Sequence, residues 1–121
     1  MSVDPTHPLP GSALHPGGWL EIGVAAASEN LATVRKIDVR EPSEFNAELG
    51  HIAGAELVPL STVENAARGW DRDKPILLIC RSGGRSGGAS RALRDLGFKT
   101  VYNMTGGMLA WNGQRLPVER A

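Results

Sequence analysis

The only cysteine of this chain lies in the segment CRSGGRSGG, residues 80–88, together with two arginines and four glycines. Glycine adopts left-handed backbone dihedrals easily, so such a loop can turn successive N–H groups inward and form a cradle for an anion. From Cys80 to Arg94 there are four arginines and no acidic residue. Electropositive surroundings and a helix N-terminus favour a thiolate over the thiol, whose free pKa is about 8.5. We therefore expect Cys80 to be a nucleophile.

The residues of this loop give less support to three other interpretations: a purely structural cysteine, a nucleotide-binding loop and a metal site. A free cysteine is often only a small buried apolar residue at the end of a strand, but paired glycines and two nearby arginines favour the functional interpretation. The glycines precede no Lys-Ser/Thr pair and do not follow the G-x-G-x-x-G spacing, so a nucleotide-binding loop is not predicted. One cysteine and three scattered histidines lack metal-ligand spacing. We expect neither a metal nor an organic cofactor.

The elements that position the loop follow from the pattern of apolar residues. Strand character is found in four short runs, residues 36–39, 55–60, 75–80 and 100–104. Helices are predicted over residues 42–49, 61–69, 86–97 and 106–113, the second with a capping box from Ser61 to Glu64. Strands that alternate with helices indicate an α/β fold with a mostly parallel sheet covered on both faces.

In such a sheet, ligands bind at the carboxyl ends of the strands. Cys80 ends one predicted strand, and Asp38, Arg40 and Glu41 follow the carboxyl end of another. These three residues either orient the loop and bind a ligand, or form a local ion-pair cluster beneath the loop. We favour the ion-pair cluster for Asp38 and Glu41, and both interpretations stay open for Arg40.

Length and composition bound the remaining possibilities. A chain of 121 residues with 41% apolar residues is expected to form one domain with its own core. Thirteen basic and thirteen acidic residues cancel, and no apolar run is long enough to span a bilayer, so neither nucleic acid nor a membrane is an expected partner. A single cysteine and no secretory signal indicate the cytoplasm. The proline-rich residues 1–18 are predicted to be a flexible arm, and residues 19–121 the domain.

Several segments together resemble the single-domain rhodaneses, which are thiosulfate sulfurtransferase-like proteins. The resemblance runs from about residue 36 to residue 118 and is carried by DVREPSEF (38–45), GHIAGA (50–55), CRSGGRS (80–86), LGFKTVYNMTGG (96–107) and Trp111. It implies a three-layer fold whose central, mostly parallel sheet has about five short strands with helices on both faces. The arm before Trp19 has no counterpart in the family.

The resemblance also implies a chemistry. A persulfide would form on Cys80, and the backbone of residues 81–86 would cradle the transferred sulfur. The substrate-binding residues would be those of the loop, namely Arg81, Ser82, Gly83, Gly84, Arg85 and Ser86. Arg81 and Arg85 would face a small anionic donor such as thiosulfate. The acceptor would be cyanide or a thiol, including the thiol of a protein.

Two alternatives remain beside a sulfurtransferase. The first is a persulfide carrier or regulatory module that acts on a protein partner, although such modules often lack the cysteine. The second is a cysteine phosphatase or arsenate reductase, whose loops resemble a C-x5-R pattern. Here Arg85 follows Cys80 in a C-x4-R pattern, and the shorter loop fits one sulfur atom better than a tetrahedral oxyanion.

Overall fold

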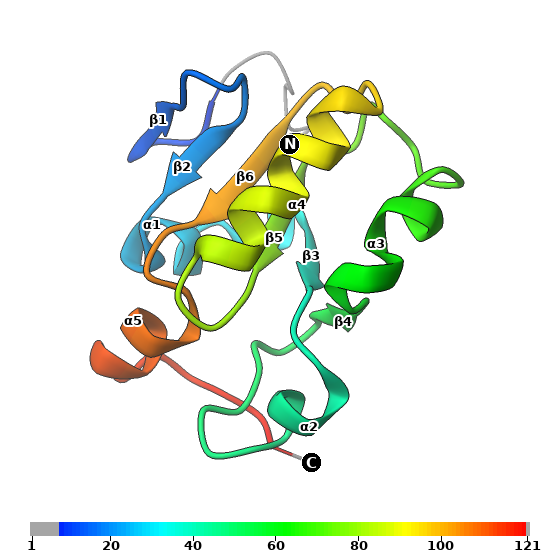
Figure 1. Cartoon of the computed structure of the whole chain (residues 1–121). Helices are drawn as coiled ribbons and strands as arrows, with labels where there is room; N and C mark the ends of the chain where they lie inside the picture. Colours follow the sequence, from blue (N-terminus) through cyan, green and yellow to red (C-terminus); the bar gives the residue numbers. More distant parts are fainter. Residues whose placement is uncertain (1–7, 121) are drawn as a thin grey trace.

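The computed structural model describes residues 8–120, which form one six-stranded sheet with helices packed on it (Figure 1). The elements are β1 Ser12–Leu14, β2 Leu20–Ile22, α1 Val24–Ser28, a 3₁₀ turn Leu31–Thr33, β3 Arg35–Asp38, α2 Pro42–Phe45, β4 Glu56–Leu57, α3 Leu60–Ala67, β5 Ile76–Ile79, α4 Gly84–Asp95, β6 Val101–Met104 and α5 Gly107–Gly113. The strand order is β1-β2-β6-β5-β3-β4. Only β1 runs antiparallel to its neighbour, and the other pairings are parallel. The predicted α/β fold is therefore confirmed.

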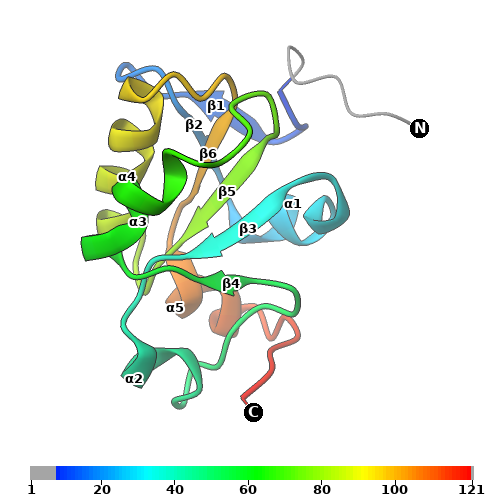
Figure 2. The ribbon, with the colours of Figure 1, turned by 90° about the vertical axis from the view of Figure 1, so that its right-hand side faces the viewer.

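The centre of the sheet is β5, whose four aliphatic residues are fully buried between β3 and β6. Because side chains alternate along a strand, Ile76 and Leu78 enter one core while Leu77 and Ile79 enter the other. The first core includes residues of α3 and α4, and the second includes residues of α1 and α5. Figure 2 shows α3 and α4 on one side of the sheet and α1 on the other. The strand that carries the cysteine is thus held from both sides.

Three details differ from the sequence-based expectation. The helix predicted over 42–49 ends at Phe45, and its capping box joins Glu41 to Glu44. The capping box predicted at Ser61 is wrong, because the chain is already helical at Leu60, directly after Pro59, and no side chain caps this helix. The run 55–60 contributes only the two-residue strand β4.

The N-terminal segment also differs. The chain was expected to lack regular structure through residue 18, but Ser12–Leu14 forms β1, which pairs with β2 at the edge of the sheet. Leu9 is also bound to the sheet, because its backbone N–H donates a hydrogen bond to the hydroxyl of Tyr102 in β6 at 3.0 Å. Residues 1–7 of the predicted arm lie outside the described residues. Where the folded domain begins stays a prediction.

Candidate active site

Cys80 lies directly after β5, and the end of its strand is fixed by α5. The thiol-bearing residue is buried, with 1% of its surface exposed. Its carbonyl accepts the N–H of Met108 at 2.9 Å, and the carbonyl of Arg81 accepts the N–H of Leu109 at 3.0 Å. Both donors belong to the first turn of α5, where N–H groups have no partner within the helix. The carbonyls at the start of the loop are therefore held against α5, away from the cysteine sulfur.

The N–H groups that follow turn the opposite way, toward the sulfur. Gly83 donates its N–H to Cys80 Sγ at 3.1 Å, and Ser86 donates its N–H at 3.3 Å. The hydroxyl oxygen of Ser86 also lies 3.3 Å from the sulfur. Gly83 has φ +101°, a left-handed conformation that glycine adopts without the steric cost of a side chain. The helix α4 begins at the next residue, Gly84, so the sulfur sits at the helix N-terminus.

These contacts set the ionisation of the thiol. Burial of Cys80 raises its pKa, but hydrogen bonds from Ser86, Gly83 and Ser82 lower it, and the net result is a pKa below the ordinary value of a cysteine thiol. The loop therefore favours a thiolate, and the groups that lower the pKa are hydrogen-bond donors of the loop. Among the loop residues predicted to bind substrate, Gly83, Ser86 and the backbone of Ser82 are in place around the sulfur.

The two loop arginines lie in different surroundings. Arg85 forms a paired contact with the carboxylate of Glu44 in α2, with Nη1–Oε1 and Nη2–Oε2 distances of 2.7 and 2.8 Å. The guanidinium group lowers the pKa of Glu44 to about 2 and is itself held charged. The role of Arg85 toward an anionic donor stays a prediction, and this pairing weighs against it. Arg81 is exposed and has no ion-pair partner among residues 8–120.

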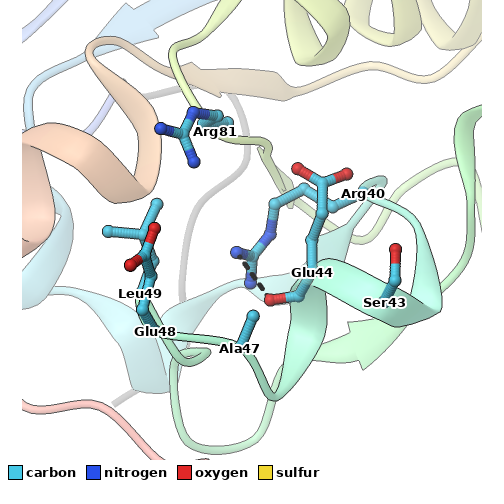
Figure 3. A pocket seen from close by; sticks show the side chains of 7 residues that line it. All are labelled: Arg40, Ser43, Glu44, Ala47, Glu48, Leu49 and Arg81. Carbon is cyan, nitrogen blue, oxygen red and sulfur yellow. Dashed lines mark hydrogen bonds between the residues drawn. The ribbon is translucent and has the colours of Figure 1, made fainter.

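A shallow pocket of about 80 Å³ adjoins the loop. It lies between the loop and the segment that contains α2, and its lining residues are Arg40, Ser43, Glu44, Ala47, Glu48, Leu49 and Arg81. In Figure 3 the guanidinium group of Arg81 reaches toward this pocket from the loop side. Arg81 therefore faces this pocket, and its contact with an anionic donor stays a prediction.

Asp38 and Arg40 form the buried ion pair that one of the two interpretations predicted. Arg40 Nε and Nη2 lie 2.9 and 2.8 Å from the two carboxylate oxygens of Asp38, and both residues are almost fully buried. Arg40 also donates to the carbonyls of Gly50 and Glu44 at 2.7 and 3.3 Å (Figure 3 draws the bond to Glu44). This geometry uses the guanidinium group to join β3 to the segment 44–50, which supports a structural role. Any contact of Asp38 or Arg40 with a substrate stays a prediction.

Two residues that contact the loop, Asn103 and Gly107, were not singled out from the sequence. Asn103 is a buried amide in β6 that contacts Ser86 and Glu21. Gly107 starts α5, and a Cβ atom there would lie 2.5 Å from the carbonyl carbon of Arg81. A polar residue within the apolar run TVYNM was the available signal for Asn103. The adjacent pair Gly106–Gly107 was the signal for a close backbone approach.

Two absences apply to the part of the chain that the structure describes. Within residues 8–120, no three histidine, cysteine, aspartate or glutamate side chains are grouped as a metal site would require. In the same range, no helix has the length and apolarity needed to cross a membrane.

Comparisons with known proteins agree with this geometry. The family model described as "Rhodanese-like domain" matches residues 24–114. The putative sulfur carrier protein YrkF of Bacillus subtilis is 41% identical over 78 residues, which cover 64% of this chain and 41% of YrkF. Thiosulfate sulfurtransferase GlpE of Pseudoalteromonas translucida is 36% identical over 74 residues, covering 61% of this chain and 69% of GlpE.

A solved structure shows the same fold. The crystal structure of a rhodanese-related protein from Thermoplasma volcanium superposes with a TM-score of 0.76 at 33% identity and covers 84% of this chain and 98% of that protein. The chain spans 41–60% of the length of three of the curated relatives that it matches. Because the family model covers most of the chain and the cysteine loop has the geometry described above, the protein belongs to the rhodanese-like family.

Proposed function

We propose that this protein is a sulfurtransferase that moves sulfane sulfur through a persulfide on Cys80. The observation that carries the proposal is the cradle: the sulfur is buried at the N-terminus of α4 and accepts the N–H groups of Gly83 and Ser86 at 3.1 and 3.3 Å. Such an arrangement stabilises a thiolate, and it is also suited to the negative charge of a persulfide. The family supports sulfur transfer as the reaction class.

The reaction would proceed in two covalent steps. The Cys80 thiolate attacks the outer sulfur of thiosulfate or a similar anionic donor, the S–S bond of the donor breaks, and sulfite leaves with the electron pair. The cysteine then carries an anionic persulfide. A thiolate or cyanide acceptor attacks the outer sulfur, the bond between the two sulfurs breaks, and its electron pair returns to Cys80. Neither step needs a metal or an organic cofactor.

Arg81 is the residue we propose to bring the donor to the loop. It is exposed, has no ion-pair partner among the described residues, and lines the pocket that adjoins the loop. Arg85, whose charge is already compensated by Glu44, would mainly hold α2 against the loop. Thiosulfate is our proposed donor because the name of GlpE specifies it for that relative. We propose the cytoplasm as the location, because the mechanism requires a reduced thiol.

A persulfide carrier is the second candidate, and the name of YrkF as a putative sulfur carrier favours it. A carrier and an enzyme share the first step and differ in the second. A carrier would form its persulfide quickly and turn over slowly with small acceptors. Phosphatase activity is less well supported. Arg85 is paired with the carboxylate of Glu44 and is not free to bind an oxyanion next to the sulfur.

Turnover with thiosulfate and cyanide tests the enzymatic proposal. We expect the wild-type protein to release thiocyanate catalytically and the Cys80→Ser variant to release none. Rapid hydrolysis of an aryl phosphate by the wild type, lost in Cys80→Ser, would instead favour phosphatase chemistry. Fast loading with sulfur but no turnover with cyanide or small thiols would favour the carrier.

A further inference from the structure

A series of hydrogen-bonded side chains leads to the cysteine sulfur. It runs from Glu21 in β2 through Asn103 in β6 to Ser86 in α4, and Ser86 contacts Cys80. Asn103 Nδ2 lies 2.8 Å from Glu21 Oε2, and Ser86 Oγ forms a short contact with Asn103 Oδ1. Asn103 and Ser86 are both buried. The sulfur-transfer steps proposed above leave Glu21 and Asn103 without a role.

The orientation of the Asn103 amide is fixed by its neighbours. Its nitrogen lies 2.8 Å from the Glu21 carboxylate and 3.2 Å from the carbonyl oxygen of Gly83. An amide nitrogen only donates, and an ionised carboxylate and a carbonyl only accept. Rotating the amide by half a turn would place its oxygen against these two acceptors. Asn103 Oδ1 therefore faces Ser86 and accepts a hydrogen bond from its hydroxyl group.

The hydroxyl group of Ser86 has a single proton and three acceptors within reach. These are Asn103 Oδ1, which is the nearest, Cys80 Sγ at 3.3 Å and the Gly83 carbonyl oxygen at 3.3 Å. While the proton points to Asn103, the lone pairs of the hydroxyl oxygen face the sulfur. In that state Ser86 can accept a hydrogen bond from a thiol but offers none to a thiolate. Donation to the thiolate requires the hydroxyl group to rotate away from Asn103.

We propose that Asn103 is a positioning residue that restrains Cys80 by holding the Ser86 hydroxyl proton away from the sulfur, and that this proton turns to the sulfur when the thiolate or persulfide forms. On ionisation the thiol proton leaves to water, and the hydroxyl group only rotates. Asn103 and Glu21 neither gain nor lose a proton. The restraint on the thiol stands on these contacts alone, whereas its bearing on persulfide chemistry rests on the proposed function.

The substitution Asn103→Leu removes the competing acceptor at similar side-chain size. The carbonyl of Gly83 keeps a partner, because the N–H of Gly87 donates to it at 3.0 Å. Glu21 is half-buried and can bind water instead. The variant therefore leaves no buried polar group without a partner other than the Ser86 hydroxyl, which is free to donate to the sulfur.

The test is the pH dependence of alkylation by iodoacetamide, a small neutral reagent, followed by mass. Since the chain has one cysteine, the modified thiol can only be Cys80. Loss of one competing hydrogen bond should raise the thiolate fraction about fivefold to tenfold below the midpoint. Because a thiolate of lower pKa is also a weaker nucleophile, we expect alkylation about two- to threefold faster. The midpoint should move to lower pH.

The matched control is the same substitution in a Ser86→Ala background. Without the hydroxyl group, Asn103→Leu has no proton to release, so we expect the single variant Ser86→Ala and the double variant to have the same midpoint and rate. Equal acceleration in both backgrounds, or a midpoint that moves upward in Asn103→Leu, would overturn the proposal. Thermal unfolding checks each variant, and Asn103→Ala replaces Asn103→Leu if the latter does not fold. Alkylation needs no sulfur donor, so this result is independent of whether thiosulfate is the substrate.

Discussion

The close contact between the start of α5 and the cysteine loop, made by hydrogen bonds from Met108 and Leu109, can be tested by a substitution at Gly107. Gly107 has φ +56°, and a Cβ atom at this position would lie 2.5 Å from the carbonyl carbon and oxygen of Arg81 and 2.6 Å from the carbonyl oxygen of Cys80. Real Cβ contacts do not occur below 3.0 Å, and the atoms in the way are backbone atoms. In Gly107→Ala the start of α5 and the start of the loop must therefore move apart.

The structure allows the size of the effect to be worked out. A left-handed conformation costs a residue with a Cβ atom about 1–2 kcal/mol, and overpacking adds about 1–3 kcal/mol. We expect Gly107→Ala to lower the free energy of unfolding by about 2–5 kcal/mol, which most domains survive folded. The hydrogen bonds from Met108 and Leu109 to the loop would lengthen from 2.9 and 3.0 Å. A displacement of about 1 Å at a reacting group can cost about a hundredfold in rate.

The assay is the rate of sulfur loading of the cysteine by thiosulfate, measured by intact mass on samples whose folding is checked by thermal unfolding. Gly113→Ala is the matched control, because it lies in the same helix and a Cβ atom there meets nothing within 4 Å. We expect loading to be slowed by tenfold to a hundredfold in Gly107→Ala and unchanged in Gly113→Ala. If Gly107→Ala is loaded with sulfur as fast as the wild type and is as stable, the contact between α5 and the loop does not position Cys80.

Three further predictions concern charged groups. Arg81→Ala should raise the KM for thiosulfate while leaving alkylation by a neutral reagent unchanged, because Arg81 has no ion-pair partner within residues 8–120 and lines the pocket. Equal losses in both assays would contradict this role. Asp38→Ala leaves the buried charge of Arg40 uncompensated and should lower the free energy of unfolding in urea by about 3–5 kcal/mol, and a loss within experimental error would count against the pair as a structural element. The folded-state pKa of Glu44 is lowered from 4.5 to about 2. The pairing of Glu44 with Arg85 therefore stabilises the fold fully above pH 4.5, and this stabilisation is lost as the pH falls from 4.5 toward 2. The pair is partly exposed, so we expect about 1 kcal/mol or less, measured as the difference in acid unfolding between wild type and Glu44→Gln.

Much of the fold could be predicted because local pattern and global packing agree. The aliphatic run 75–80 is typical of a strand buried on both faces, and β5 is the central strand of the sheet. Gly97 was expected to end the helix before it, and it has φ +97° directly after the last helical turn. The capping box predicted at Ser61 is wrong because the helix begins at Leu60, with Pro59 as its N-cap, and the residue types alone do not show which of Pro59 and Ser61 takes that position.

The site could be predicted only in part. The contact between the cysteine sulfur and the glycine turn could be expected from local sequence, since Cys80 and Gly83 are three residues apart. The pairing of Arg85 with Glu44 and the contact of Ser86 with Asn103 join residues 41 and 17 positions apart. Such contacts depend on how α2 and β6 pack against the loop, and no local pattern encodes them. Sequence therefore located the loop cysteine better than the groups that surround its sulfur.

The central claim is that Cys80 carries sulfur, and an intact mass measurement after thiosulfate treatment tests it most directly. The account predicts that the wild-type protein gains the mass of one sulfur atom, that cyanide or dithiothreitol removes it, and that Cys80→Ser gains nothing. A folded and reduced wild-type protein that gains no sulfur from thiosulfate would contradict the proposed donor. If persulfides of glutathione and of proteins also failed to load it, sulfur transfer through this cysteine would be contradicted.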